Sequence, residues 1–134
     1  MTGDSTLVIV DAANVVGSVP DGWWRDRHGA AERLRDSLVP YAAEGIPGHT
    51  TGPVELVLVV EGAARQVVPV PGVRVEAASG SGDDLIAGLA AAAHGVRPCL
   101  VVTADRGLRQ RCEAYGARCT GPRTVRPLPP PPGA

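Results

Sequence analysis

Phenylalanine and lysine are both absent from this 134-residue sequence, and only 3% of its residues are aromatic. A folded chain without phenylalanine must build its core from aliphatic side chains, and a hydrophobic content of 44% is enough for one domain of this length. We expect at least one of the adjacent Trp23 and Trp24 to fill this core. The sequence therefore predicts a single domain with an aliphatic core.

Cysteine is scarce as well, and its spacing excludes two kinds of site. The three cysteines, Cys99, Cys112 and Cys119, are odd in number and lack the C-x-x-C spacing of a zinc site. They are typical of reduced thiols, not of a disulfide framework. No apolar run approaches the ~20 residues of a membrane span, and the first residues lack the basic and apolar regions of a secretion signal. We therefore expect a cytoplasmic protein with no membrane partner.

Charge is nearly balanced overall, at −1, but it is unevenly distributed. Residues 1–96 contain 6 Arg and 12 Asp or Glu, whereas residues 97–134 contain 7 Arg and only Asp105 and Glu113 as acids. An acidic part followed by a basic end suits a metal site beside a phosphate-binding surface. Ordinary solvated surface also explains these counts, and on the charge counts alone it is the favoured interpretation.

Apolar runs alternate with helical patterns along the chain, and this alternation predicts an α/β fold with a parallel sheet and right-handed crossovers. The run that ends at Asp11 is unbroken by charge, as expected of a strand buried on both faces. Strands are predicted over 6–10, 54–60, 73–77, 98–103 and 117–120, and helices over 26–43, 83–94 and 106–115.

Three of the predicted strands are followed by a carboxylate. Asp11, Glu61 and Asp105 each come just after a strand, and Asp84 lies at the start of a helix. Because the carboxyl ends of parallel strands share one edge of a sheet, these acids are expected to converge there. Carboxylates at close range repel one another unless they are protonated or hold a cation, and oxygen-only ligands favour Mg²⁺ or Mn²⁺ over zinc. The simpler alternative for Asp11 is that it only caps the following turn.

The segments around these acids resemble those of the PIN-like nuclease superfamily, and within it the NYN and YacP-like branch. The resemblance covers most of residues 6–122 and is carried by DAAN, VVEG, GSGDDLIAGLA and LVVTADRGLRQRCEAYGARCTGP. It implies a three-layer α/β/α fold with a central, mostly parallel sheet and an Mg²⁺- or Mn²⁺-dependent ribonuclease site. Residues 1–122 would form this domain, and the proline-rich residues 123–134 an extended, disordered tail.

The resemblance also implies roles for individual residues. The family's metal-binding and catalytic acids fall on Asp11, Glu61, Asp84 and Asp105, although Glu61 stands where this branch often has Asp. We expect Asp84, not Asp83, to face the site, because the family's helix acid directly precedes the apolar LIAG run.

Four further residues are candidates for contacting the substrate or supporting the acids. Asn14 matches the D-x-x-N form of the branch and would position Asp11. Thr103 lies two residues before Asp105 and is expected to hydrogen-bond either a scissile phosphate or a carboxylate. Arg106 and Arg109 share a helical face beside the proposed site, where they would bind RNA phosphates or form ordinary solvated surface.

The function predicted from the sequence is a metal-dependent endoribonuclease that hydrolyses RNA phosphodiester bonds. Two alternatives stay open: a metal-dependent nucleotide pyrophosphohydrolase acting on free triphosphates, and a non-catalytic RNA-binding or interaction module. The absence of lysine and of a phosphate-cradling loop disfavours the first of these only weakly. The sequence also leaves open a homodimer and a protein partner that docks on the PLPPPP segment.

Overall fold

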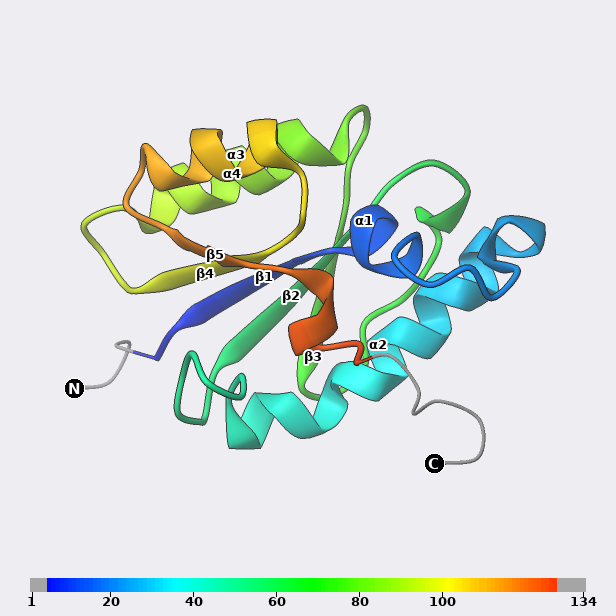
Figure 1. Ribbon diagram of the computed structural model, residues 1–134, viewed down its shortest axis with the longest axis horizontal. Coiled ribbons are helices and arrows are strands. Elements are labelled where there is room, and N and C mark those ends of the chain that lie inside the picture. The colour runs from blue at the N-terminus through cyan, green and yellow to red at the C-terminus, as the bar shows by residue number, and fades with distance from the viewer. Residues whose placement is uncertain (1–4, 128–134) are drawn as a thin grey trace.

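A computed structural model describes residues 5–127 of the chain. Five parallel strands form one sheet in the order β3-β2-β1-β4-β5, so β1 lies in the middle, as its unbroken apolar run predicts (Figure 1). The predicted α/β fold is therefore confirmed, and the sheet is parallel throughout. The strands are β1 (Leu7–Asp11), β2 (Glu55–Val60), β3 (Val73–Ala77), β4 (Cys99–Val102) and β5 (Arg118–Thr120).

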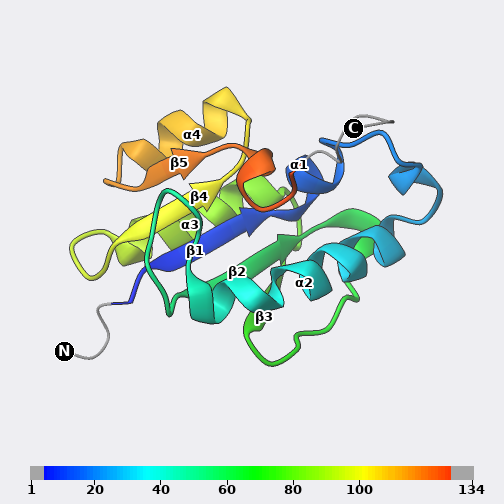
Figure 2. The ribbon, with the colours of Figure 1, turned by 60° about the horizontal axis from the view of Figure 1, so that its bottom comes forward.

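One face of the sheet is covered by the long helix α2 (Arg27–Glu44), which crosses in front of β2 in Figure 2. Asp26 caps this helix by accepting a hydrogen bond from the Gly29 backbone N–H at 2.9 Å. Its Leu34 and Leu38 pack against even-numbered strand residues such as Val8 and Leu58. Trp23 packs at the margin of this cluster, which confirms that one of the two tryptophans contributes to the core.

Helices α3 (Gly82–Ala93) and α4 (Arg106–Glu113) cover the opposite face and complete the three-layer arrangement. Odd-numbered strand residues point to this side, so Ile9 and Val101 contact Ile86 of α3 and Leu108 of α4 in a second core cluster. The alternation follows from the pleat, which directs successive side chains to opposite faces. Strands buried on both faces explain why the strand sequences show no polar alternation.

The strand order places a topological switch beside β1. The chain goes from β1 outward to β2 and β3, then crosses back through α3 to β4 on the other side of β1. Parallel registers align Leu7 with Glu55 and with Cys99, so these strands end together at one edge. In open α/β sheets a crevice forms at the carboxyl edge, next to such a switch, and ligands bind there.

Besides a turn after β5, three short elements escaped prediction from the sequence. Helix α1 (Ala12–Val16) follows β1 directly, and two 3-10 turns, η1 (Trp23–Arg25) and η2 (Gly62–Ala64), lie near the carboxyl edge. Each contains too few residues to show a helical period.

The chain after β5 is packed against the domain beyond residue 122, where the sequence suggested a tail. A 3-10 turn, η3 (Pro122–Thr124), follows β5, Val125 is only 3% exposed, and Arg126 donates to the backbone oxygens of Val15 and Val16. Residues 128–134 of the expected tail lie outside the described part of the chain. Among the described helices, none is long and apolar enough to cross a membrane.

Candidate active site

Asp11 is the innermost carboxylate of the carboxyl edge. It is the last residue of β1 and is only 5% exposed. Its Oδ1 accepts the Asn14 backbone N–H at 3.3 Å and so caps α1, and its Oδ2 accepts the Thr103 hydroxyl at 2.9 Å. Capping and placement in the crevice are therefore properties of the same residue, not alternatives.

Thr103 links two of the predicted acids. Its hydroxyl donates to Asp11 and accepts the Asp105 backbone N–H at 3.2 Å. Of the two roles predicted for Thr103, the contact with a carboxylate is the one observed. Because Thr103 is fully buried, it is not available to a substrate.

Asn14 has a different role from the one predicted. Its side-chain oxygen accepts the Ala104 backbone N–H at 2.8 Å, so it ties α1 to the loop between β4 and α4. Only its backbone contacts Asp11. Asn14 therefore positions the loop that carries Asp105, and its effect on Asp11 comes through the capping turn.

Glu61 follows β2 and reaches across to α3. Its Oε1 accepts the Gly82 backbone N–H at 3.1 Å. A β-carbon on Gly82 would lie 2.3 Å from this oxygen, so only glycine allows the contact. The second glycine of the GSG segment therefore serves a close approach between two elements of the edge, a role that the sequence pattern alone did not indicate.

The predicted orientation of Asp83 and Asp84 is wrong. Asp84 points away from the edge: its side chain is 76% exposed and forms an ion pair with Arg111 at 3.0 Å. Asp83 is half-buried. Burial raises the pKa of Asp83, and the charges of Asp105 and Glu61 raise it further against that of Arg111. The charge of Asp83 in turn acts to raise the pKa of Asp11. The orientation differs from the prediction because α3 begins at Gly82, with Ser81 as its cap, so the first-turn residue facing the crevice is Asp83.

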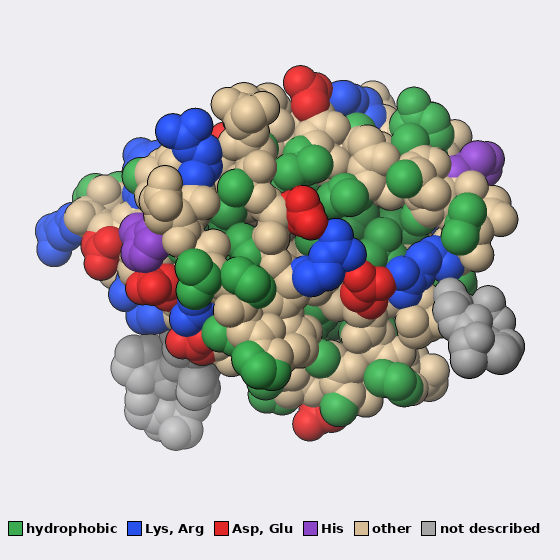
Figure 3. All heavy atoms as spheres, turned by 180° about the vertical axis from the view of Figure 1, so that it is seen from behind, with side chains coloured by type: hydrophobic (Ala, Val, Ile, Leu, Met, Phe, Trp, Pro, Cys, Tyr) green, Lys and Arg blue, Asp and Glu red, His purple; other side chains and the backbone are tan. Residues whose placement is uncertain are grey.

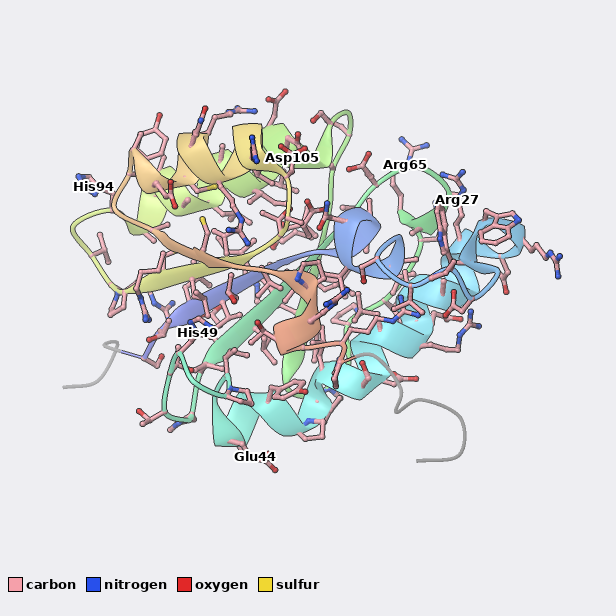
Figure 4. All side chains as sticks on the ribbon, in the orientation of Figure 1. Arg27, Glu44, His49, Arg65, His94 and Asp105 are labelled. Carbon is pink, nitrogen blue, oxygen red and sulfur yellow. The ribbon has the colours of Figure 1, made fainter. Side chains whose placement is uncertain are left out.

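Asp105 caps α4, since its Oδ1 accepts the Leu108 backbone N–H at 2.9 Å. Figure 4 shows Asp105 at the top centre of the molecule, between Arg65 and Arg27 to its right and His94 and His49 to its left.

The two predicted phosphate-binding arginines differ from each other. Arg106 is exposed at the start of α4, beside Asp105. Arg109 donates from Nε to the backbone oxygen of Thr103 at 2.7 Å. This hydrogen bond fixes Arg109 within the fold, so of the pair Arg106 is the better placed to meet a ligand.

Electrostatics distinguish this edge from the rest of the surface. Burial is the largest cause of the raised pKa of Asp11, and Asp83 and Glu61 raise it further, against the hydrogen bonds from Thr103 and Asn14. Burial likewise raises the pKa of Asp83, followed by the charges of Asp105 and Glu61. Among the described ion pairs, none includes Asp11 or Asp83, although the nearby charge of Arg111 acts to lower the pKa of Asp83.

The amino edge of the same sheet shows the opposite arrangement. Glu55 pairs with Arg97 and with Arg74, each at 2.5 Å, and Arg74 also pairs with Glu76 at 2.8 Å. The hydrogen bond from Arg97 holds the pKa of Glu55 below its usual value. Acidic and basic side chains thus alternate on this face, as Figure 3 shows. Within residues 5–127, Glu55 and Glu76 are thus paired with arginine, whereas no ion pair includes Asp11, Glu61 or Asp105.

The carboxyl edge offers only oxygen donors, which suit a hard divalent cation such as Mg²⁺ or Mn²⁺. Within residues 5–127, no three His, Cys, Asp or Glu side chains are gathered closely enough to form a ready ligand set. The chemistry of the group still fits, because a cation would favour the ionised form of Asp11 and Asp83, whose pKa values burial raises first and neighbouring acids raise further. Burial raises the pKa of Cys99 to about 11 and that of Cys112 to about 12, so these thiols stay protonated and do not compete as ligands.

A parallel sheet between two helical layers, with acids where its strands end, is consistent with the PIN-like fold that the sequence resembles. One solved structure with this fold is Rae1 (YacP) from Bacillus subtilis, with a TM-score of 0.69 and 19% identity over 89% of this chain and 70% of that one. A point mutant of the same protein aligns with a TM-score of 0.68 and 18% identity over 90% of this chain and 72% of that one. At these identities the likeness establishes the fold. No protein-family model matches the chain, and no curated protein matches its sequence.

Proposed function

We propose that this protein is a divalent-metal-dependent ribonuclease. The observation that carries the proposal is the placement of Asp11, Glu61, Asp83 and Asp105 at the carboxyl edge of a YacP-like fold, where hydrogen bonds through Thr103 and Gly82 connect their elements. These four side chains would hold Mg²⁺ or Mn²⁺, with Asp83 in place of the predicted Asp84. When bound, the metal would activate water and stabilise negative charge on the phosphodiester.

The surrounding residues hold this group in place. The hydroxyl of Thr103 keeps the Asp11 carboxylate directed toward the edge, and Gly82 does the same for Glu61. The amide oxygen of Asn14 fixes the loop before Asp105. Such hydrogen bonds reduce the freedom of the acids before substrate arrives, which is how positioning contributes to catalysis.

Arg106 would meet the RNA backbone next to Asp105. Contacts with phosphates orient a nucleic acid but do not read its sequence, so this contribution is independent of base identity. An exposed arginine beside an acidic site also offsets the repulsion between that site and an anionic substrate.

The test is a cleavage assay with single-stranded RNA, with free nucleoside triphosphates as a parallel substrate, each in Mg²⁺, Mn²⁺ and EDTA. The proposal expects metal-dependent RNA cleavage that Asp11→Asn abolishes and Asp84→Asn leaves near the wild-type rate. Turnover of triphosphates without RNA cleavage would establish the pyrophosphohydrolase instead. RNA binding without turnover of either substrate would indicate a non-catalytic module.

A further inference from the structure

We propose that the cavity between Trp23, Arg27 and Glu61 binds the base of a nucleotide next to the scissile phosphate of a single-stranded RNA. This inference rests on the proposed ribonuclease function and adds a subsite to it. The cavity has a volume of about 160 Å³ and is open between η1, the start of α2 and the segment that follows β2.

Small residues create this cavity at the acidic edge. Ala12 and Ala13 of α1 line one wall, and Gly62 and Ala63 of η2 line another. The volume is well below the ~300–1,000 Å³ of clefts that enclose drug-sized ligands, so it suits one ring system and not a length of RNA.

The wall formed by Trp23 and Arg27 has the chemistry that recognises bases. The guanidinium carbon of Arg27 lies 5.1 Å from the centre of the Trp23 ring, within the range of a cation–π contact. Unstacked bases of single-stranded RNA are held by stacking on aromatic rings and on guanidinium planes. Figure 4 shows Arg27 on the side of the molecule where β1 ends.

The loop that carries Trp23 is held in place from two sides. Trp23 is half-buried and packs on the core cluster beneath α2. Before it, Asp21 pairs with Arg126, whose guanidinium also donates to the backbone oxygens of Val15 at 3.2 Å and Val16 at 2.9 Å. The aromatic wall is therefore formed before a ligand arrives, which lowers the entropy that binding must overcome.

Glu61 connects the cavity to the carboxylates. It lines the cavity and also accepts the Gly82 N–H at the acidic edge. A base in the cavity would accordingly bring its own phosphate toward Asp11 and Asp83, beside the Glu61 carboxylate. The neighbouring Trp24 is 51% exposed and is not among the cavity residues, so it serves as an internal contrast.

The test uses Trp23 fluorescence in a Trp24→Phe variant, in which Trp23 is the only tryptophan. We expect adenosine 5′-monophosphate to quench this fluorescence saturably and ribose 5-phosphate not to do so. Ala63→Leu should fill the cavity from an exposed position and weaken the quenching about fivefold or more, the lower end expected for a lost base stack. Ala43→Leu, exposed at the far end of α2, is the matched control and should change nothing.

The outcomes separate this subsite from the ribonuclease itself. Equal quenching by the two ligands, or equal quenching in the Ala63→Leu variant, would overturn the subsite even if RNA is cleaved. Saturable, base-dependent quenching in a protein that cleaves no RNA would support the subsite and refute the ribonuclease. If RNA is cleaved, an abasic nucleotide beside the cleavage position should lower the cleavage rate of the wild-type protein. The decrease should be about as large as the one that Ala63→Leu causes with intact RNA. Combining the abasic RNA with Ala63→Leu should lower the rate no further.

Discussion

Replacing Asp83 and Asp84 one at a time by Asn tests the arrangement of the acidic edge most directly. The two residues are adjacent, both lie in the first turn of α3, and both interact favourably with the helix dipole. Their surroundings differ: Asp83 lies among Asp105 and Glu61, whereas Asp84 pairs with Arg111 in solvent. Any difference in stability or metal binding between the two variants therefore reflects the surroundings of each side chain and not its interaction with the helix dipole.

The size of the effect follows from these surroundings. With the Asp84 and Arg111 side chains 76% and 48% exposed, their ion pair contributes only about 0.2–1 kcal/mol. Asp84→Asn loses this pair, and Asp83→Asn instead relieves repulsion. In the metal-free protein we expect Asp83→Asn to be the more stable variant by about 1 kcal/mol, or a few degrees in Tm for a domain of this size.

Metal binding should reverse this order. Two unit charges about 4 Å apart attract by about 4 kcal/mol at an effective dielectric constant near 20. Losing even a third of that attraction would weaken Mn²⁺ binding about tenfold. We therefore expect Asp83→Asn to bind Mn²⁺ at least about tenfold more weakly than the wild type and to lose most RNA cleavage, while Asp84→Asn changes both by less than about threefold.

Calorimetric titration with Mn²⁺, thermal unfolding with and without metal, and the RNA assay together measure these effects. Equal losses in both variants would mean that both acids bind the metal. A larger loss in Asp84→Asn would refute the placement of Asp83 at the edge and restore the orientation expected from the LIAG run.

Three other perturbations follow from the same geometry. Burial and neighbouring acids raise the pKa of Asp11, so the folded protein binds this proton more tightly than the unfolded chain does. The free energy of unfolding should therefore fall as pH rises from the unfolded pKa of Asp11 through its raised folded pKa. In denaturant unfolding of the metal-free protein, Asp11→Asn should flatten this fall and stabilise the protein at neutral pH. Gly82→Ala should displace the Glu61 carboxylate and lower RNA cleavage, with a loss of unfolding free energy of about 1 kcal/mol or less, because the displaced atom ends a flexible side chain. Arg106→Gln should reduce the salt dependence of RNA binding by somewhat less than one unit of slope, whereas Arg109→Gln should mainly lower Tm, by leaving the Thr103 carbonyl without its donor. If Arg106→Gln leaves the salt dependence of RNA binding unchanged, Arg106 makes no contact with the RNA phosphates and is an ordinary surface residue.

The strands were predictable because burial on both faces leaves a clear pattern. Val8 to Val10 and Leu56 to Val60 are continuous apolar runs, and each is followed by an acid whose place at the carboxyl edge depends only on parallel topology. The position of Asp11, Glu61 and Asp105 at one edge therefore followed from the order of elements and required no knowledge of side-chain contacts.

The choice between Asp83 and Asp84 was not predictable in the same way. It depends on where α3 begins, and one residue of difference turns a helical side chain by about 100°. The start is set by the Ser81 hydroxyl, which caps the helix through Asp83 N–H, and by the contact between Gly82 and Glu61, 21 residues earlier. A long-range contact of this kind has no local sequence signature, and the same holds for the cavity beside Trp23, which is assembled from four separate segments.

The use of arginine in α4 argues that the unpaired acids at the carboxyl edge are maintained for function. This helix offers Arg106, Arg109 and Arg111 close to them, yet Arg109 donates to Thr103 and Arg111 pairs with the outward-facing Asp84. Among the described ion pairs, none includes Asp11, Glu61, Asp83 or Asp105, although Glu55 at the other edge has two arginine partners. A domain optimised for stability alone would neutralise or replace such a group, and natural proteins retain destabilising sites mainly where activity requires them. Under the proposed function a bound cation would remove this cost, so the affinity for Mn²⁺ would depend directly on the acids that no described ion pair neutralises.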